Sequence, residues 1–108
     1  QDSYYIMNLN LNFRNNQIRL IKFDYFQVLR SIFRLDFSRN KIDEIEDKSF
    51  SNLGLLKYLD LSINNLSNFS LSCFIGLYRL ELLNLSHNSI ELINRNLFKE
   101  LHLLISLD

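Results

Sequence analysis

Four asparagines recur at a fixed interval of 24 residues along the chain: Asn16, Asn40, Asn64 and Asn88. Apolar residues recur in phase with them, and the position ten residues after each asparagine is always phenylalanine, namely Phe26, Phe50, Phe74 and Phe98. A fixed period of this length is the signature of a repeat architecture, in which each repeat buries its apolar edge against its neighbours. We therefore expect a solenoid of stacked 24-residue coils.

Each coil divides into two halves. In the first half, Leu59-Asp60-Leu61 alternates apolar and polar residues, which predicts a strand with one buried face. Asn64 then turns the chain, and its side chain can bond backbone groups of its own coil and of the neighbouring coil. In the second half, residues 42–53, the apolar spacing predicts loops and short 3-10 or helical turns with Phe50 in the core. Stacking the coils places their strands in one parallel sheet.

The period also sets boundaries. We predict a single array over residues 1–108 with four repeats, at 8–31, 32–55, 56–79 and 80–103, and partial repeats at both ends. Residues 1–7 match the end of an earlier coil, and Leu107 and Asp108 fall inside an expected fifth strand. A cut within a coil exposes apolar core. We therefore expect a segment of a longer protein, whose uncapped ends could dimerise.

Residues 56–66 carry the pattern of a known family. Leu56-Lys57-Tyr58-Leu59-Asp60-Leu61-Ser62-Ile63-Asn64-Asn65-Leu66 resembles the leucine-rich repeat consensus L-x-x-L-x-L-x-x-N-x-L, and residues 32–42 and 80–90 match it equally well. With its period, the chain resembles the "typical" extracellular subclass, similar to Toll-like receptor ectodomains and small leucine-rich proteoglycans. The resemblance implies an α/β solenoid: a horseshoe segment with a concave parallel β-sheet and convex loops or 3-10 turns.

The resemblance also implies a function. Such arrays bind other proteins, so we expect an extracellular protein-binding module, part of a membrane receptor ectodomain that recognises ligands or patterns in innate immunity. Two alternatives stay open: a matrix or adhesion protein in which the coils act as a structural spacer, and an intracellular scaffold repeat. The L-x-G-x-I-P signature of plant receptors is missing, which argues against a plant receptor. We expect no enzymatic activity.

The expected binding surface is the concave face, because outward-facing strand residues usually make the contacts in this family. The partner would be another protein or a glycan-bearing ligand. Aromatic and arginine side chains are favoured as interface anchors. The candidate partner-binding residues are Phe33, Arg34, Asp36, Arg39, Tyr58, Asp60, Ile63, Leu82 and His87. The alternative is an ordinary solvated sheet without a hot spot.

Charge and hydropathy narrow the expected partners. Twelve Lys and Arg residues balance twelve Asp and Glu residues, so the chain has no basic excess and we expect no nucleic-acid partner. No apolar run approaches the roughly 20 residues of a membrane span, so we expect no direct membrane insertion in this segment. The first residues, Gln1-Asp2-Ser3, carry no signal-peptide pattern.

One outward column places oxygen-bearing residues one rung apart: Asp36, Asp60, Asn84 and Asp108. Stacked carboxylates could bind Ca²⁺, which takes oxygen ligands. They could equally be neutralised by Arg34 and Lys57, or hydrogen-bond the serines two residues further on. Asp is common at this position in the family. We therefore favour the structural role and expect neither a metal site nor a cofactor.

Three Asn-x-Ser sequons mark candidate N-glycosylation sites, at Asn65, Asn68 and Asn84. Asn65 and Asn68 follow a strand, where a glycan fits. Asn84 is expected on the concave face, where a glycan would shield the surface from ligands.

Two further features suggest chemistry that we do not expect. Ser86 and His87 near Asp60 resemble a hydrolytic triad, but adjacent strand residues point to opposite sides, so nucleophile and base would not meet. Cys73 is the only cysteine and precedes the core residue Phe74. We expect a buried, inert thiol; the alternative is an intermolecular disulfide or a reactive thiol.

Overall fold

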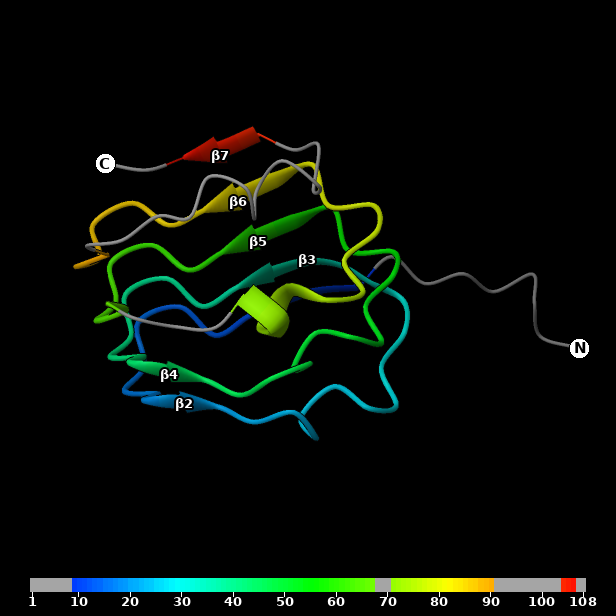
Figure 1. Ribbon diagram of the computed structural model, residues 1–108, viewed down its shortest axis with the longest axis horizontal. Coiled ribbons are helices and arrows are strands. Elements are labelled where there is room, and N and C mark those ends of the chain that lie inside the picture. Colours follow the sequence, from blue (N-terminus) through cyan, green and yellow to red (C-terminus); the bar gives the residue numbers. More distant parts are fainter. Residues whose placement is uncertain (1–8, 68–70, 91–103, 107–108) are drawn as a thin grey trace, which may run out of the picture.

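The computed structural model describes residues 9–67, 71–90 and 104–106 (Figure 1). One parallel sheet contains, in this order, β1 (Leu9–Asn12), β3 (Ile32–Asp36), β5 (Tyr58–Asp60), β6 (Leu82–Asn84) and β7 (Leu104–Ser106). Each coil adds one strand beside the strand of the preceding coil. The predicted solenoid with a parallel sheet is therefore confirmed.

The returning halves of the coils are mostly turns. The first two returns contain the short strands β2 (Leu20–Ile21) and β4 (Glu44–Ile45), which pair in parallel, and the third contains the 3-10 helix η2 (Leu71–Phe74). The turns and the 3-10 helix agree with the sequence prediction. The paired strands do not, because two residues are too few to show an alternating pattern. No helix in the part of the chain that the structure describes is long and apolar enough to cross a membrane.

The strand register follows the 24-residue period over four strands. Tyr58 pairs with Arg34 on one side and with Leu82 on the other, so residues one period apart share a rung. The last pairing departs from the period. Leu82 pairs with Leu104, an interval of 22 residues, and Ser106 lies opposite Asn84. Ser106 thus takes the place in this column that the sequence predicted for Asp108, which lies outside the described residues. A shift of two residues keeps the same strand positions on each face, so the apolar pattern tolerates it.

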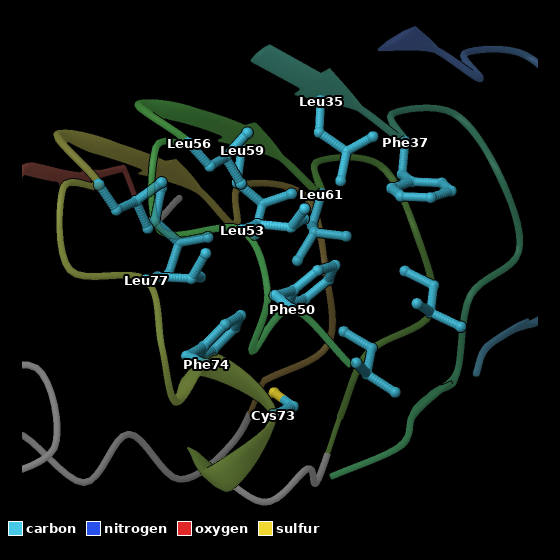
Figure 2. Packing of buried hydrophobic residues seen from close by; sticks show 14 of the residues in the cluster. Leu35, Phe37, Phe50, Leu53, Leu56, Leu59, Leu61, Cys73, Phe74 and Leu77 are labelled. Atoms are coloured by element: carbon cyan, nitrogen blue, oxygen red, sulfur yellow. The ribbon is translucent and has the colours of Figure 1, made fainter. Parts of the chain in front are cut away.

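The core is a stack of equivalent side chains from successive coils. The rings of Phe26, Phe50 and Phe74 follow one another at centroid distances of 6.2 Å each. Phe50 is fully buried, as predicted, and faces Phe74 among the leucines of the coil (Figure 2). The fourth residue of the predicted phenylalanine column, Phe98, lies outside the described residues. Every ring in the stack depends on the next coil to cover it, so the apolar edges are buried cooperatively.

The recurring asparagines connect the coils through their side chains. The amide nitrogen of Asn64 donates to the carbonyls of Leu61, at 3.1 Å, in its own coil and of Phe37, at 3.1 Å, in the preceding coil. Its oxygen accepts the backbone N–H of Ile42 at 2.9 Å. Asn40 and Asn88 make the same set of bonds one coil earlier and one coil later. The predicted bonding within and between coils is confirmed.

Replacing Asn64 by Ala should destabilise the array strongly. The substitution leaves the Ile42 N–H without its acceptor and removes one of two amide donors from the Phe37 and Leu61 carbonyls, which keep those of Asn40 and Asn88. We expect the free energy of unfolding to fall by about 3 kcal/mol, because the unsatisfied Ile42 N–H costs about 1–3 kcal/mol and the lost amide bonds add to that. Asn16 provides the matched control, since it is exposed and, among the residues that the structure describes, bonds only carbonyls of its own coil. Asn16→Ala should cost about 1 kcal/mol. Equal losses in chemical denaturation would contradict the inter-coil role.

Candidate partner-binding face

The candidate residues lie mostly on the side of the five-stranded sheet that points away from the core, which we call the sheet face. Strand alternation turns Leu35, Leu59 and Leu83 into the core, so the residues beside them point outward. The register then aligns the outward residues in two columns. The first column holds Asn10, Arg34, Tyr58 and Leu82, and the second holds Asn12, Asp36, Asp60 and Asn84.

An aromatic cluster with two cations lies along β3 and the start of β5. The guanidinium of Arg34 lies 4.6 Å from the centre of the Tyr58 ring, and the Phe33 ring meets Tyr58 edge to face at 5.6 Å. Lys57 lies 5.2 Å from the Phe33 ring and 3.6 Å from a carboxylate oxygen of Glu81. The structure thus brings together Phe33, Arg34 and Tyr58, three of the residues that the sequence predicts for the binding surface. The cation–π contact also fixes which way the Arg34 side chain points.

A small hollow adjoins this cluster. It has a volume of about 70 Å³, and the candidate residues Arg34, Asp36, Tyr58, Asp60 and Leu82 line it together with Leu35, Leu59 and Asn84. Pockets for small-molecule substrates typically measure about 300–1,000 Å³. The hollow therefore has room for the end of one side chain of a larger partner, not for a separate small-molecule substrate.

The oxygen-bearing column has a structural role. The Oδ1 atom of Asp60 accepts the Ser62 backbone N–H at 2.9 Å and the Ser62 hydroxyl at 2.6 Å. Asn84 does the same with Ser86 at 3.0 and 2.6 Å, and Asp36 and Asn12 each accept the N–H two residues further on. These bonds end the strand in a turn. Among the described residues, no group of three or more His, Cys, Asp or Glu side chains could hold a metal ion together.

Three candidate residues lie beyond the strand ends, in a row of their own. Arg39, Ile63 and His87 have φ angles of 57°, 55° and 56°. The N–H groups of Arg39 and Ile63 donate to Ser62 and Ser86 of the following coil, at 3.1 and 3.0 Å, so the next coil holds this left-handed backbone in place. The conformation is strained for Ile63, because β-branched residues rarely adopt positive φ. Nothing in the sequence of these three residues signals the turn, and the row does not line the hollow.

The candidate glycosylation sites differ in exposure. Asn65 is exposed, whereas Asn84 is half-buried and its side-chain oxygen already accepts the Ser86 hydroxyl at 2.6 Å. Asn68 lies outside the described residues. Of the two described positions, Asn65 has the side chain that a glycan can reach more easily.

Cys73 and the Ser86–His87 pair were not expected to take part in catalysis. Cys73 is fully buried beside Phe74 (Figure 2), so its predicted burial is confirmed. Burial raises the pKa of its thiol well above the usual range, and the charge of Asp47 adds to the effect. The thiol therefore stays protonated and weakly nucleophilic at neutral pH. The Ser86 hydroxyl donates to Asn84, and His87 is exposed beyond the strand end.

Comparison with protein families identifies the repeat. The family model described as "Leucine rich repeat" matches residues 6–66 and 56–108, which together span most of the chain. The chain belongs to the leucine-rich repeat family. A search of curated proteins gave no match.

This leucine-rich repeat segment is similar to parts of two longer chains in solved structures. The crystal structure of the TLR13–ssRNA13 complex matches with a TM-score of 0.83 and 32% identity over 91% of this chain. The leucine-rich repeat domain of APL1B matches with a TM-score of 0.80 and 29% identity over 96% of this chain. The matches cover only 15% and 31% of those two chains. The resemblance to Toll-like receptor ectodomains is thus confirmed for the fold and the repeat.

Proposed function

We propose that this leucine-rich repeat segment binds a protein or a glycan-bearing ligand through the sheet face, as part of a receptor ectodomain. Leucine-rich repeats generally bind proteins, and TLR13 is one of the similar structures. The observation that carries the proposal is the cluster of Phe33, Arg34 and Tyr58 beside the hollow. Aromatic and arginine side chains beside a desolvated depression are the usual energetic centres of interfaces.

A purely structural spacer accounts less well for this cluster. A coil that serves only to hold its neighbours apart needs a buried core and the asparagine bonds between coils. It does not need an arginine stacked on an outward tyrosine. The cluster therefore favours recognition over a purely architectural role.

Single-stranded RNA is a second candidate partner. The sequence-based exclusion rested on zero net charge, which describes the whole chain and not one surface. Arg34 and Arg39 are exposed, and Arg34 with Tyr58 forms a platform on which a base could stack. One structural relative, TLR13, was solved in complex with ssRNA. The exclusion is therefore not supported, and single-stranded RNA belongs in any binding test.

Tyr58→Ala should weaken binding at the sheet face. A suitable experiment selects peptides from a random phage-displayed library on the immobilised chain and measures their affinity for variants. Loss of the ring at the centre of the cluster should cost about 2 kcal/mol, or roughly 30-fold in Kd. Tyr78→Ala is the matched control, because Tyr78 is 86% exposed on a returning segment and does not line the hollow. Binders that lose affinity only with Tyr78→Ala, or with neither variant, would contradict the proposal.

An extracellular location is part of the proposal, and it is supported by the Toll-like receptor relative and by the exposed sequon at Asn65. When the chain is expressed with a secretion signal in animal cells, we expect Asn65 to carry a glycan. Mass spectrometry before and after deglycosylation measures this, with Asn65→Gln as the control. A secreted chain without a glycan at Asn65 would remove this support.

A further inference from the structure

We infer that the hollow of the sheet face accepts a positively charged side chain, Lys or Arg, presented by a protein segment and held between the carboxylates of Asp36 and Asp60. This inference rests on the proposed function and specifies the chemistry of the partner.

The first argument is that the fold does not require the negative charges. The side-chain oxygen in this column accepts the N–H two residues further on, whether it belongs to Asp36 and Asp60 or to Asn12 and Asn84. Asn84 even reproduces both bonds of Asp60, with the serine N–H and the serine hydroxyl. An amide oxygen is therefore sufficient for the turn, and the negative charges of Asp36 and Asp60 are not needed to form it.

The second argument is that no neighbour neutralises the carboxylates. Neither Asp36 nor Asp60 has an ion pair within the described residues, where Lys57 pairs with Glu81 instead. Arg34 is the nearest cation in the hollow, but its guanidinium lies over the Tyr58 ring. The lining holds two carboxylates against one guanidinium and so carries an excess of negative charge. A cationic group complements this surface, whereas a phosphate would be repelled.

The third argument concerns shape. Asp36 and Asp60 are register partners on the neighbouring strands β3 and β5, so their side chains lie on the same rung, with the strands about 4.8 Å apart. Because each Oδ1 atom is turned to the residue two positions further on, an ammonium or guanidinium can be shared by the remaining oxygens. Tyr58 and Leu82 line the same hollow and can cover the methylene stem of a Lys or Arg. The volume of about 70 Å³ suits one such side-chain end.

The test compares two double variants that change net charge equally. Asp36→Asn with Asp60→Asn removes the proposed site, and the chain's own Asn12 and Asn84 show that asparagine preserves the turn. Asp24→Asn with Asp43→Asn is the control, because both residues are exposed and neither lines the hollow. Binding to both double variants is measured with peptides selected from a random phage-displayed library. A single-stranded RNA oligonucleotide is the competing probe.

We expect the selected peptides to be enriched in Lys and Arg. Their affinity should fall about tenfold for the Asp36 and Asp60 double variant, stay unchanged for the control, and weaken with rising salt. Unfolding midpoints should be equal for both variants. Peptides that need Tyr58 but show no basic enrichment, and bind both double variants equally, would overturn this inference while leaving the proposed function intact. If no peptide depends on Tyr58, both fail. RNA that binds, and binds more tightly once Asp36 and Asp60 are neutralised, would overturn the choice of a basic protein segment.

Discussion

The hydrogen bonds of the buried asparagine side chains are the interaction on which the solenoid depends. Each coil turns sharply after its strand, and the turn leaves backbone groups in a region that water does not reach. A buried backbone group without a partner is costly. Asn64 satisfies such groups in two coils at once, because its amide bonds Phe37 and Leu61 and its oxygen bonds Ile42. The side chain therefore both closes its own turn and fixes the distance to the preceding coil.

The fixed stacking of the coils explains how the sheet face obtains a defined surface. Since neighbouring strands keep the register set by the period, outward residues 24 positions apart meet on one rung. Arg34 and Tyr58 are such a pair, and so are Asp36 and Asp60. Because the backbone of paired strands is already ordered, little further backbone freedom is lost when a partner binds, which favours affinity. The core and the proposed binding surface thus use opposite faces of the same strands, and the outward residues can vary without disturbing the core.

Much of this fold could be predicted from the repeat alone. The period predicts the parallel sheet, the burial of Phe50 and the bonding role of Asn64, because each follows from equivalent positions meeting in successive coils. The shortened last interval could not be predicted. Leu104, Ile105 and Leu107 offer apolar residues in more than one frame, and a two-residue shift preserves strand parity. Likewise, a two-residue strand such as β4 leaves no periodic trace.

The candidate site could be predicted only as a set of positions. Alternation places Arg34, Tyr58 and Asp60 on one face, but it does not say that Arg34 turns towards the tyrosine and not towards a carboxylate. That choice depends on side-chain geometry, and it decides whether Arg34 pairs with a carboxylate of the hollow or leaves both carboxylates without an ion pair. The strained backbone of Ile63 is equally invisible in the sequence, since the following coil imposes it. Zero net charge was misleading because it averages over surfaces that face different ways.

Native-state hydrogen exchange of single backbone amides tests most directly whether the asparagine side chains hold the coils together. The informative amides are those of Ile42 and Leu66, whose acceptors are the side-chain oxygens of Asn64 and Asn88. If these bonds are as permanent as the sheet, both amides should exchange as slowly as those of Leu35 and Leu59, through global unfolding only. Exchange of Ile42 and Leu66 orders of magnitude faster than the sheet amides would contradict the account, because the coils would then be held by apolar stacking and the sheet alone.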